Sequence, residues 1–268
     1  MEIIENVDDW RKRYAGWNRE MGAAGELGKS YPFVENTRAP FTPARRALPM
    51  LNLALISSAG GYIDGTDGFD LNDPDGDVNF REIPSEIELS DLRFAARGYD
   101  PTFVQQDPNV QVPLDRLREF EANRVIGQLN SAFWSFNGFI PNAARLVETA
   151  LPKLVERLQR YEVQAALLIP ASRLCHQSVA LAARAIESAG LPTMILGVDR
   201  GVLEKVRAPR AAFYDGQFGS VAGQPDWPEH QRRVLDEALR WIEPMDQPGV
   251  SKLAVALESQ VEAARGER

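Results

Sequence analysis

The stretch AALLIPASRLCHQSVALAARAIESAGLPTMILGV, residues 165–198, holds a short apolar run, a longer amphipathic segment and a second short apolar run. Apolar runs of this length, as in AALLIP and LPTMILGV, predict buried strands. The spacing of apolar residues from Cys175 to Gly190 predicts a helix that a glycine closes. A strand, a helix and a second strand in this order predict a parallel crossover unit, which is typical of the α/β class.

The rest of the chain extends this pattern in both directions. Further strands are predicted within residues 49–65, 91–96 and 208–216. Further helices are predicted over residues 6–21, 112–127, 137–163 and 226–243, with Pro113 and Pro228 in first turns and Asp226 as a candidate N-cap. We therefore expect an α/β fold with a mostly parallel sheet and helices on both faces, in Rossmann-like or flavodoxin-like layers.

Three segments are expected along the chain. Residues 1–45 form an N-terminal extension of one helix and a loop, residues 46–245 form an α/β domain of catalytic type, and residues 246–268 form a C-terminal helix. The strand at residues 49–65 leads into an acidic loop, GTDGFDLNDPDGDVNF, which is the best candidate for a boundary within the α/β domain.

The composition excludes several classes of partner. The net charge of −8 disfavours nucleic acid and anionic membranes, because both require a basic surface. The acidic N-terminus does not resemble a signal peptide, and no apolar run has the length of a membrane span, so a cytoplasmic protein is expected. One cysteine and two histidines are too few for an ordinary zinc site, and no phosphate-binding loop is present. We expect no metal and no bound cofactor.

Cys175 is the only cysteine, and it stands beside His176. Ligands of such sheets bind beyond the carboxyl ends of the strands, where this helix begins and where the turn SSAGG, residues 57–61, should also lie. A thiolate at a helix N-terminus is stabilised by free backbone N–H groups, so the thiol pKa is predicted near 7, below its usual 8.5 or so. The alternative, a small buried apolar residue, stays equally open.

Three arginines beside prolines are candidates for holding a substrate carboxylate, because a guanidinium matches a carboxylate in bidentate geometry. They are Arg81, Arg116 and Arg210. A structural ion pair is an equal alternative for each of them.

Several motifs occur together in a recognisable order. FTPARRALPMLNLALISSAGGYIDG, GDVNFREIP, YDPTFVQQDPNVQVPLDRL, VIGQL, CHQSVALAARAIESAGLPT and APRAAFYDGQFGSVAGQP lie within about residues 40–240. This order resembles the selenoprotein B family, the component B proteins of glycine, sarcosine, betaine and D-proline reductases and their selenium-free relatives. The resemblance implies reductive cleavage at the α-carbon of a small amino acid by a Sec-x-x-Cys pair. It places Ser172 at the selenocysteine position and Cys175 at the cysteine, so this chain holds no second thiol.

The predicted catalytic residues are Cys175, His176 and Ser172. The predicted substrate-binding residues are Ser57, Ser58, Gly60, Arg81, Tyr99, Asp107, Asn109, Arg116, Gln177 and Arg210. Three functions stay open: a thiol enzyme that cleaves a C–X bond of a small carboxylated substrate reductively, a redox-neutral cysteine isomerase or lyase, and a non-catalytic subunit. An external thiol or a reductase partner subunit would donate electrons, and a homo-oligomer is compatible with the sequence.

Overall fold

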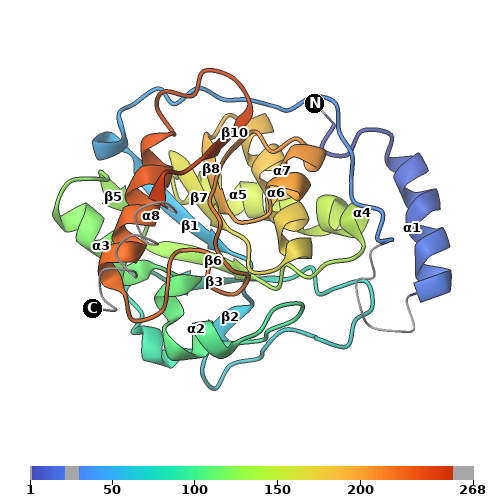
Figure 1. The fold of residues 1–268 in the computed structure, drawn as a ribbon, viewed down its shortest axis with the longest axis horizontal. Coiled ribbons are helices and arrows are strands. Elements are labelled where there is room, and N and C mark those ends of the chain that lie inside the picture. The colour runs from blue at the N-terminus through green and yellow to red at the C-terminus, as the bar shows by residue number, and fades with distance from the viewer. Residues whose placement is uncertain (1, 22–29, 256–268) are drawn as a thin grey trace, which may run out of the picture.

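The computed structural model describes residues 2–21 and 30–255. Its body is a mixed sheet with the strand order β10-β9-β8-β7-β1-β6-β3, and a short strand β5 also pairs with β1 (Figure 1). All of these pairs are parallel except β3 with β6. The strands of this sheet are β1 (Asn52–Ser57), β3 (Phe80–Pro84), β5 (Gln128–Leu129), β6 (Ala132–Phe136), β7 (Ala165–Ile169), β8 (Thr193–Gly197), β9 (Arg210–Phe213) and β10 (Gly249–Lys252).

Helices cover both faces of the sheet, which confirms the predicted fold class. On one face, α5 (Leu151–Arg160), α6 (Arg173–Ser188) and α7 (Arg200–Val206) pack against alternate strand residues such as Ile56. On the other face, α3 (Leu114–Ala122) and α8 (Pro228–Arg240) pack against the intervening residues such as Leu55 (Figure 1). The central strands β1 and β7 are therefore buried along both faces, as their continuous apolar sequences predicted.

The helix α6 is buried on nearly all sides and is fixed at both ends by its own sequence. The Ser172 side chain caps its start by accepting a hydrogen bond from the Cys175 N–H. Gly190 follows its last turn with φ of +88°, a conformation that glycine adopts without steric cost. The Leu191 N–H then closes the end on the Ile186 carbonyl, as in a Schellman motif.

The remaining elements are short or lie outside the main sheet. The helix α1 (Val7–Met21) is tied to the layer of α5 by an ion pair between Arg11 and Glu148. Strands β2 (Gly61–Ile63) and β4 (Leu92–Phe94) form a separate antiparallel pair. The single turns are η2 (Leu48–Met50), η3 (Leu89–Asp91), α2 (Thr102–Gln106), η4 (Pro108–Val110), α4 (Ala143–Arg145) and the π-helical η5 (Leu146–Ala150).

Some local predictions were wrong. The helix expected over 137–163 begins only at Ala143, and the strand β6 just before it was not predicted. Asp226 does not cap α8, since it has φ of +57° and Trp227 occupies the N-cap position without a side-chain cap. Residues 249–252, expected within a C-terminal helix, form β10, while the rest of that predicted helix, 256–268, lies outside the described residues.

Over residues 2–21 and 30–255, no helix combines the length and the apolar content needed to span a membrane. The same residues contain no cluster of three or more His, Cys, Asp or Glu side chains that could hold a metal ion.

Candidate functional site

Cys175 lies where the carboxyl ends of β1 and β7 meet the start of α6. Its Sγ accepts a hydrogen bond from Ser172 Oγ at 3.0 Å, and it faces the carbonyl oxygen of Ser58 at 3.8 Å. Ser58 is held in turn by its hydroxyl, which accepts from the Ala171 N–H at 3.0 Å. Ser58, Ser172 and Cys175 therefore lie together at this end of the strands, as expected. We call this group of residues the Cys175 pocket.

The Cys175 pocket is closed by two segments far away in sequence. Gly138, just after β6, lies so close that a methyl group on it would be 2.6 Å from Ser58 Cβ and 3.0 Å from Cys175 Sγ. Tyr99 covers the pocket from the segment after β4, and its hydroxyl donates to the Ala59 carbonyl at 2.7 Å. With these covers in place, Cys175 is only 1% exposed.

Burial decides the acidity of the Cys175 thiol. Desolvation raises its pKa above the ordinary value, and the hydrogen bonds from Ser172 and Ser58 oppose this only in part. The predicted pKa near 7 was therefore wrong. The prediction assumed that the start of α6 faces an open cleft, whereas Tyr99 and Gly138 seal it and deprive a thiolate of water.

His176 is a structural residue in this conformation. Its Nδ1 lies 2.7 Å from the Ser172 carbonyl, and its Nε2 accepts from the backbone N–H groups of Val198 and Asp199 at 2.9 and 3.1 Å. This arrangement requires a neutral ring with its proton on Nδ1. Burial lowers the His176 pKa to about 4. The prediction that His176 acts as a cation or a proton acceptor beside Cys175 is corrected, because both ring nitrogens are engaged with backbone.

Ser57 and Gly60 also lie at this edge. The Ser57 hydroxyl accepts weakly from the Ala59 N–H at 3.4 Å, and the Gly60 N–H donates to the Phe136 carbonyl at 2.9 Å. Across the β1–β6 pair, Ser57 is opposite Ser135, whose buried hydroxyl has no partner among the described residues. These residues shape the carboxyl edge beside the pocket.

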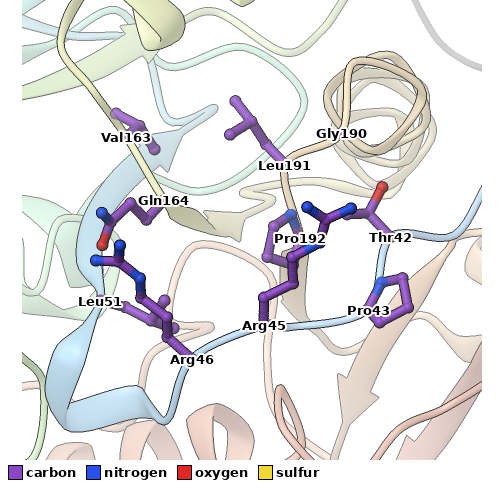
Figure 2. A pocket seen from close by; sticks show the side chains of 10 residues that line it. All are labelled: Thr42, Pro43, Arg45, Arg46, Leu51, Val163, Gln164, Gly190, Leu191 and Pro192. Atoms are coloured by element: carbon purple, nitrogen blue, oxygen red, sulfur yellow. The ribbon is translucent and has the colours of Figure 1, made fainter.

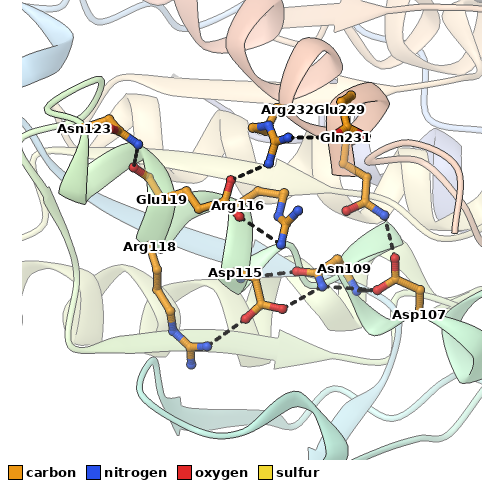
Figure 3. Close-up of polar contacts among 10 residues, drawn as sticks. All are labelled: Asp107, Asn109, Asp115, Arg116, Arg118, Glu119, Asn123, Glu229, Gln231 and Arg232. Carbon is orange, nitrogen blue, oxygen red and sulfur yellow. Dashed lines mark hydrogen bonds and ion pairs between the residues drawn. The ribbon is translucent and has the colours of Figure 1, made fainter. Parts of the chain in front are cut away.

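The three predicted carboxylate-binding arginines are held elsewhere. Arg81 binds the carbonyl oxygen of Gly68 at 2.7 Å in the acidic loop. Arg116 pairs with Glu119 at 3.0 Å on α3 (Figure 3). Arg210 begins β9 at the opposite edge of the sheet, where its fully buried guanidinium pairs with Glu187 at 2.7 Å. The expectation that Arg81 or Arg116 binds a substrate carboxylate beside Cys175 gains no support, because protein acceptors already engage each of them.

Asp107 and Asn109 organise a polar network near the start of α8 (Figure 3). Asp107 accepts from the Gln231 side chain at 2.6 Å, and Asn109 donates to Asp115 at 2.9 Å. Gln177 instead anchors the N-terminal extension by accepting from the Val34 N–H at 2.7 Å. In this conformation, the hydrogen bonds of these three predicted substrate-binding residues go to the protein itself.

The sequence prediction missed Gly138, Asn137 and Arg97. The Asn137 side chain donates to the Ala95 carbonyl at 2.8 Å and so joins β6 to the covering segment. Arg97 lies in the segment after β4 that also carries Tyr99. Its guanidinium carbon stacks over the Phe139 ring, 4.7 Å from the ring centroid. The run AFWSFNG at residues 132–138 could have indicated Asn137 and Gly138, because its aromatic residues suggest a strand and its Asn-Gly pair suggests a turn at the end of that strand.

The fold and this pocket define an α/β protein with a single buried thiol at the carboxyl edge of a parallel sheet. Comparison with known proteins agrees, since the family model for glycine/sarcosine/betaine reductase selenoprotein B matches residues 77–171. Residues 77–171 are thus similar to that selenoprotein B family, in agreement with the order of the chain's motifs, and the chain itself holds no selenocysteine. No solved structure matches the chain.

Curated relatives differ in how much of them the chain covers. The D-proline reductase subunit gamma of Acetoanaerobium sticklandii is 29% identical over 211 residues, which are 78% of this chain and 86% of that protein. The glycine reductase complex component B subunit gamma of Symbiobacterium thermophilum is 29% identical over 61% of this chain. The sarcosine reductase complex component B subunit beta of Peptoclostridium acidaminophilum is 31% identical over 62%. This chain spans only 38% of each of the last two proteins.

Proposed function

We propose that the protein is a component B-type subunit of a reductase-like complex, and that the reducing equivalents of that complex are carried outside this chain. The observation that supports the proposal most is the contact of 3.0 Å between Ser172 Oγ and Cys175 Sγ. The family resemblance places selenocysteine at residue 172, so the contact occupies the place of the family's redox pair. A hydroxyl cannot form a bridge to sulfur, so the two groups cannot store two electrons.

Two further features support this proposal. The Cys175 thiol is buried and its pKa is raised, so a thiolate is scarce at neutral pH in the closed pocket. His176 has no ring nitrogen left to accept a proton from the thiol or from a substrate. The engagement of both His176 nitrogens also weighs against a redox-neutral isomerase or lyase that would use this histidine as its base.

A second candidate is a thiol enzyme that uses Cys175 with an external thiol. The Tyr99 cover favours it, because one side-chain hydrogen bond to Ala59 holds the tyrosine over the pocket and its release would admit a small substrate. The sulfur would attack the α-carbon of a carboxylated amine and displace the amine. One external thiol would then attack the sulfur and release the protonated carbon product, and a second would regenerate Cys175 and leave an external disulfide.

Thiol consumption separates the two candidates. The purified protein is incubated with dithiothreitol and glycine, sarcosine, betaine or D-proline, beside a Cys175→Ala variant. Thiol loss is measured together with the displaced amine, which is set free from glycine, sarcosine or betaine and stays in the ring-opened product of D-proline. Under the first proposal, the unmodified protein and the Cys175→Ala variant should show the same slow background loss of thiol. A loss of two thiol groups for each amine displaced, which disappears with Cys175→Ala, would refute the first proposal and establish the second candidate.

A further inference from the structure

A groove lies at the amino-terminal ends of the parallel strands, whereas the Cys175 pocket lies at their carboxyl ends (Figure 2). It has a volume of about 480 Å³ and opens where β1, β7 and β8 begin, because Leu51, Gln164 and Pro192 directly precede those strands. The other residues that line it are Thr42, Pro43, Arg45, Arg46, Val163, Gly190 and Leu191.

Arg45 and Arg46 give this groove a local positive charge. Both are exposed, and within residues 2–21 and 30–255 neither forms an ion pair or a hydrogen bond. Figure 2 shows the Arg46 guanidinium extending toward Gln164 and the Arg45 guanidinium lying beside Pro192. Several exposed arginines have acidic partners, as Arg200 has in Glu204, and those without one, such as Arg124 and Arg207, do not stand next to another arginine. Two adjacent unpaired guanidinium groups stand out in a chain with a net charge of −8.

The rest of the groove is largely apolar. Pro43, Leu51, Leu191 and Pro192 form its walls, and Met50, which precedes Leu51, is 63% exposed. Arginine and methionine are enriched in protein interfaces, where a guanidinium contributes directed hydrogen bonds and a flexible thioether adapts its packing. Two unpaired arginines in an apolar groove, with an exposed methionine next to the lining residue Leu51 in the sequence, therefore have the composition of an interface.

We infer that this groove, the Arg45–Arg46 groove, binds an acidic segment of a partner protein. Carboxylates of the segment would pair with the two guanidinium groups in bidentate geometry, and an apolar side chain between them would contact Leu191 and Pro192. The net negative charge of the chain repels nucleic acid, and the apolar walls of the groove, Pro43, Leu51, Leu191 and Pro192, offer more surface than a small carboxylate would cover. The inference does not depend on the chemistry of Cys175, because the groove lies at the other edge of the sheet.

A labelled peptide tests the inference directly. A short fluorescein-labelled peptide of alternating Glu and Leu is titrated with the full chain at low and physiological salt, and binding is followed by fluorescence anisotropy. The matched controls are a peptide of alternating Lys and Leu and the variant R93E/R200E, which makes the same charge change at two exposed arginines outside the groove.

We expect R45E/R46E to weaken binding of the acidic peptide at least about tenfold and to gain binding of the basic peptide. R45Q/R46Q should lie between R45E/R46E and the unmodified chain, and R93E/R200E should retain most of the affinity. Equal weakening by R45E/R46E and R93E/R200E, or no binding by the unmodified chain, would overturn the inference. Displacement of the peptide by succinate at the same carboxylate concentration would also overturn it, because the groove would then be a site for small anions.

Discussion

Acid should destabilise this fold through protonation of His176. We expect the free energy of unfolding to fall between about pH 6.5 and pH 4. In the native protein the His176 pKa is lowered to about 4, because the ring is buried and Nε2 accepts from Val198 and Asp199. In the unfolded chain a histidine has a pKa of about 6.5. Between these values the unfolded chain binds a proton that the native state excludes, so lowering the pH favours unfolding.

The size of the effect follows from the two pKa values. A difference of roughly 2.5 units at about 1.36 kcal/mol per unit gives about 3 kcal/mol. This stability is fully present above pH 6.5 and is lost once the pH has fallen through the native value of about 4. Since a typical domain is stable by about 5–15 kcal/mol, a loss of this size shifts a denaturation midpoint clearly.

Urea denaturation at a series of pH values measures this contribution. Since His176 and His230 are the only histidines, His230→Asn supplies a background in which only His176 can titrate as an imidazole. The double variant His176→Gln/His230→Asn keeps a side-chain acceptor for the two N–H groups but cannot gain the proton. Carboxylates away from His176 contribute alike to both proteins and cancel in the difference between their unfolding free energies, and the interaction with Asp199 is counted with His176.

We expect this difference to shrink by about 3 kcal/mol between pH 7 and pH 4. A difference that stays constant over this range would refute the reasoning. His176 would then have to bind a proton as readily in the native state as in the unfolded chain, with a nitrogen free for acid–base chemistry.

Three further predictions concern the pocket. Ser172→Cys should form a disulfide with Cys175, so that a thiol assay after denaturation without reductant finds no free thiol, whereas Ser178→Cys should keep both thiols. Tyr99→Phe should speed iodoacetamide labelling of Cys175 about fivefold, since a hydrogen bond of about 1 kcal/mol no longer holds the cover; an unchanged rate would show that other contacts close the pocket. Gly138→Ala should lower the unfolding free energy in urea by about 1–3 kcal/mol, and a neutral result would contradict the tight approach to Ser58.

The sequence alone determined the elements whose signals are local. AALLIP and LPTMILGV became β7 and β8, and the segment between them became α6 with its glycine end at Gly190. Apolar runs, caps and turn glycines act through neighbours a few residues away, so a single stretch of chain contains the information. The strand β6 was missed because its run AFWSF is short and leads directly into residues with helical spacing.

Tertiary structure decided the chemical state of the site. The position of Cys175 at the carboxyl edge followed from the strand–helix order, but its burial depends on Ser58, Tyr99 and Gly138, which come from three other parts of the chain. The acidity of a thiol depends on whether water can reach it, and desolvation is a property of the packed neighbours. Arg210 shows the same dependence, since the sequence placed it beside a proline, whereas the fold buried it against Glu187.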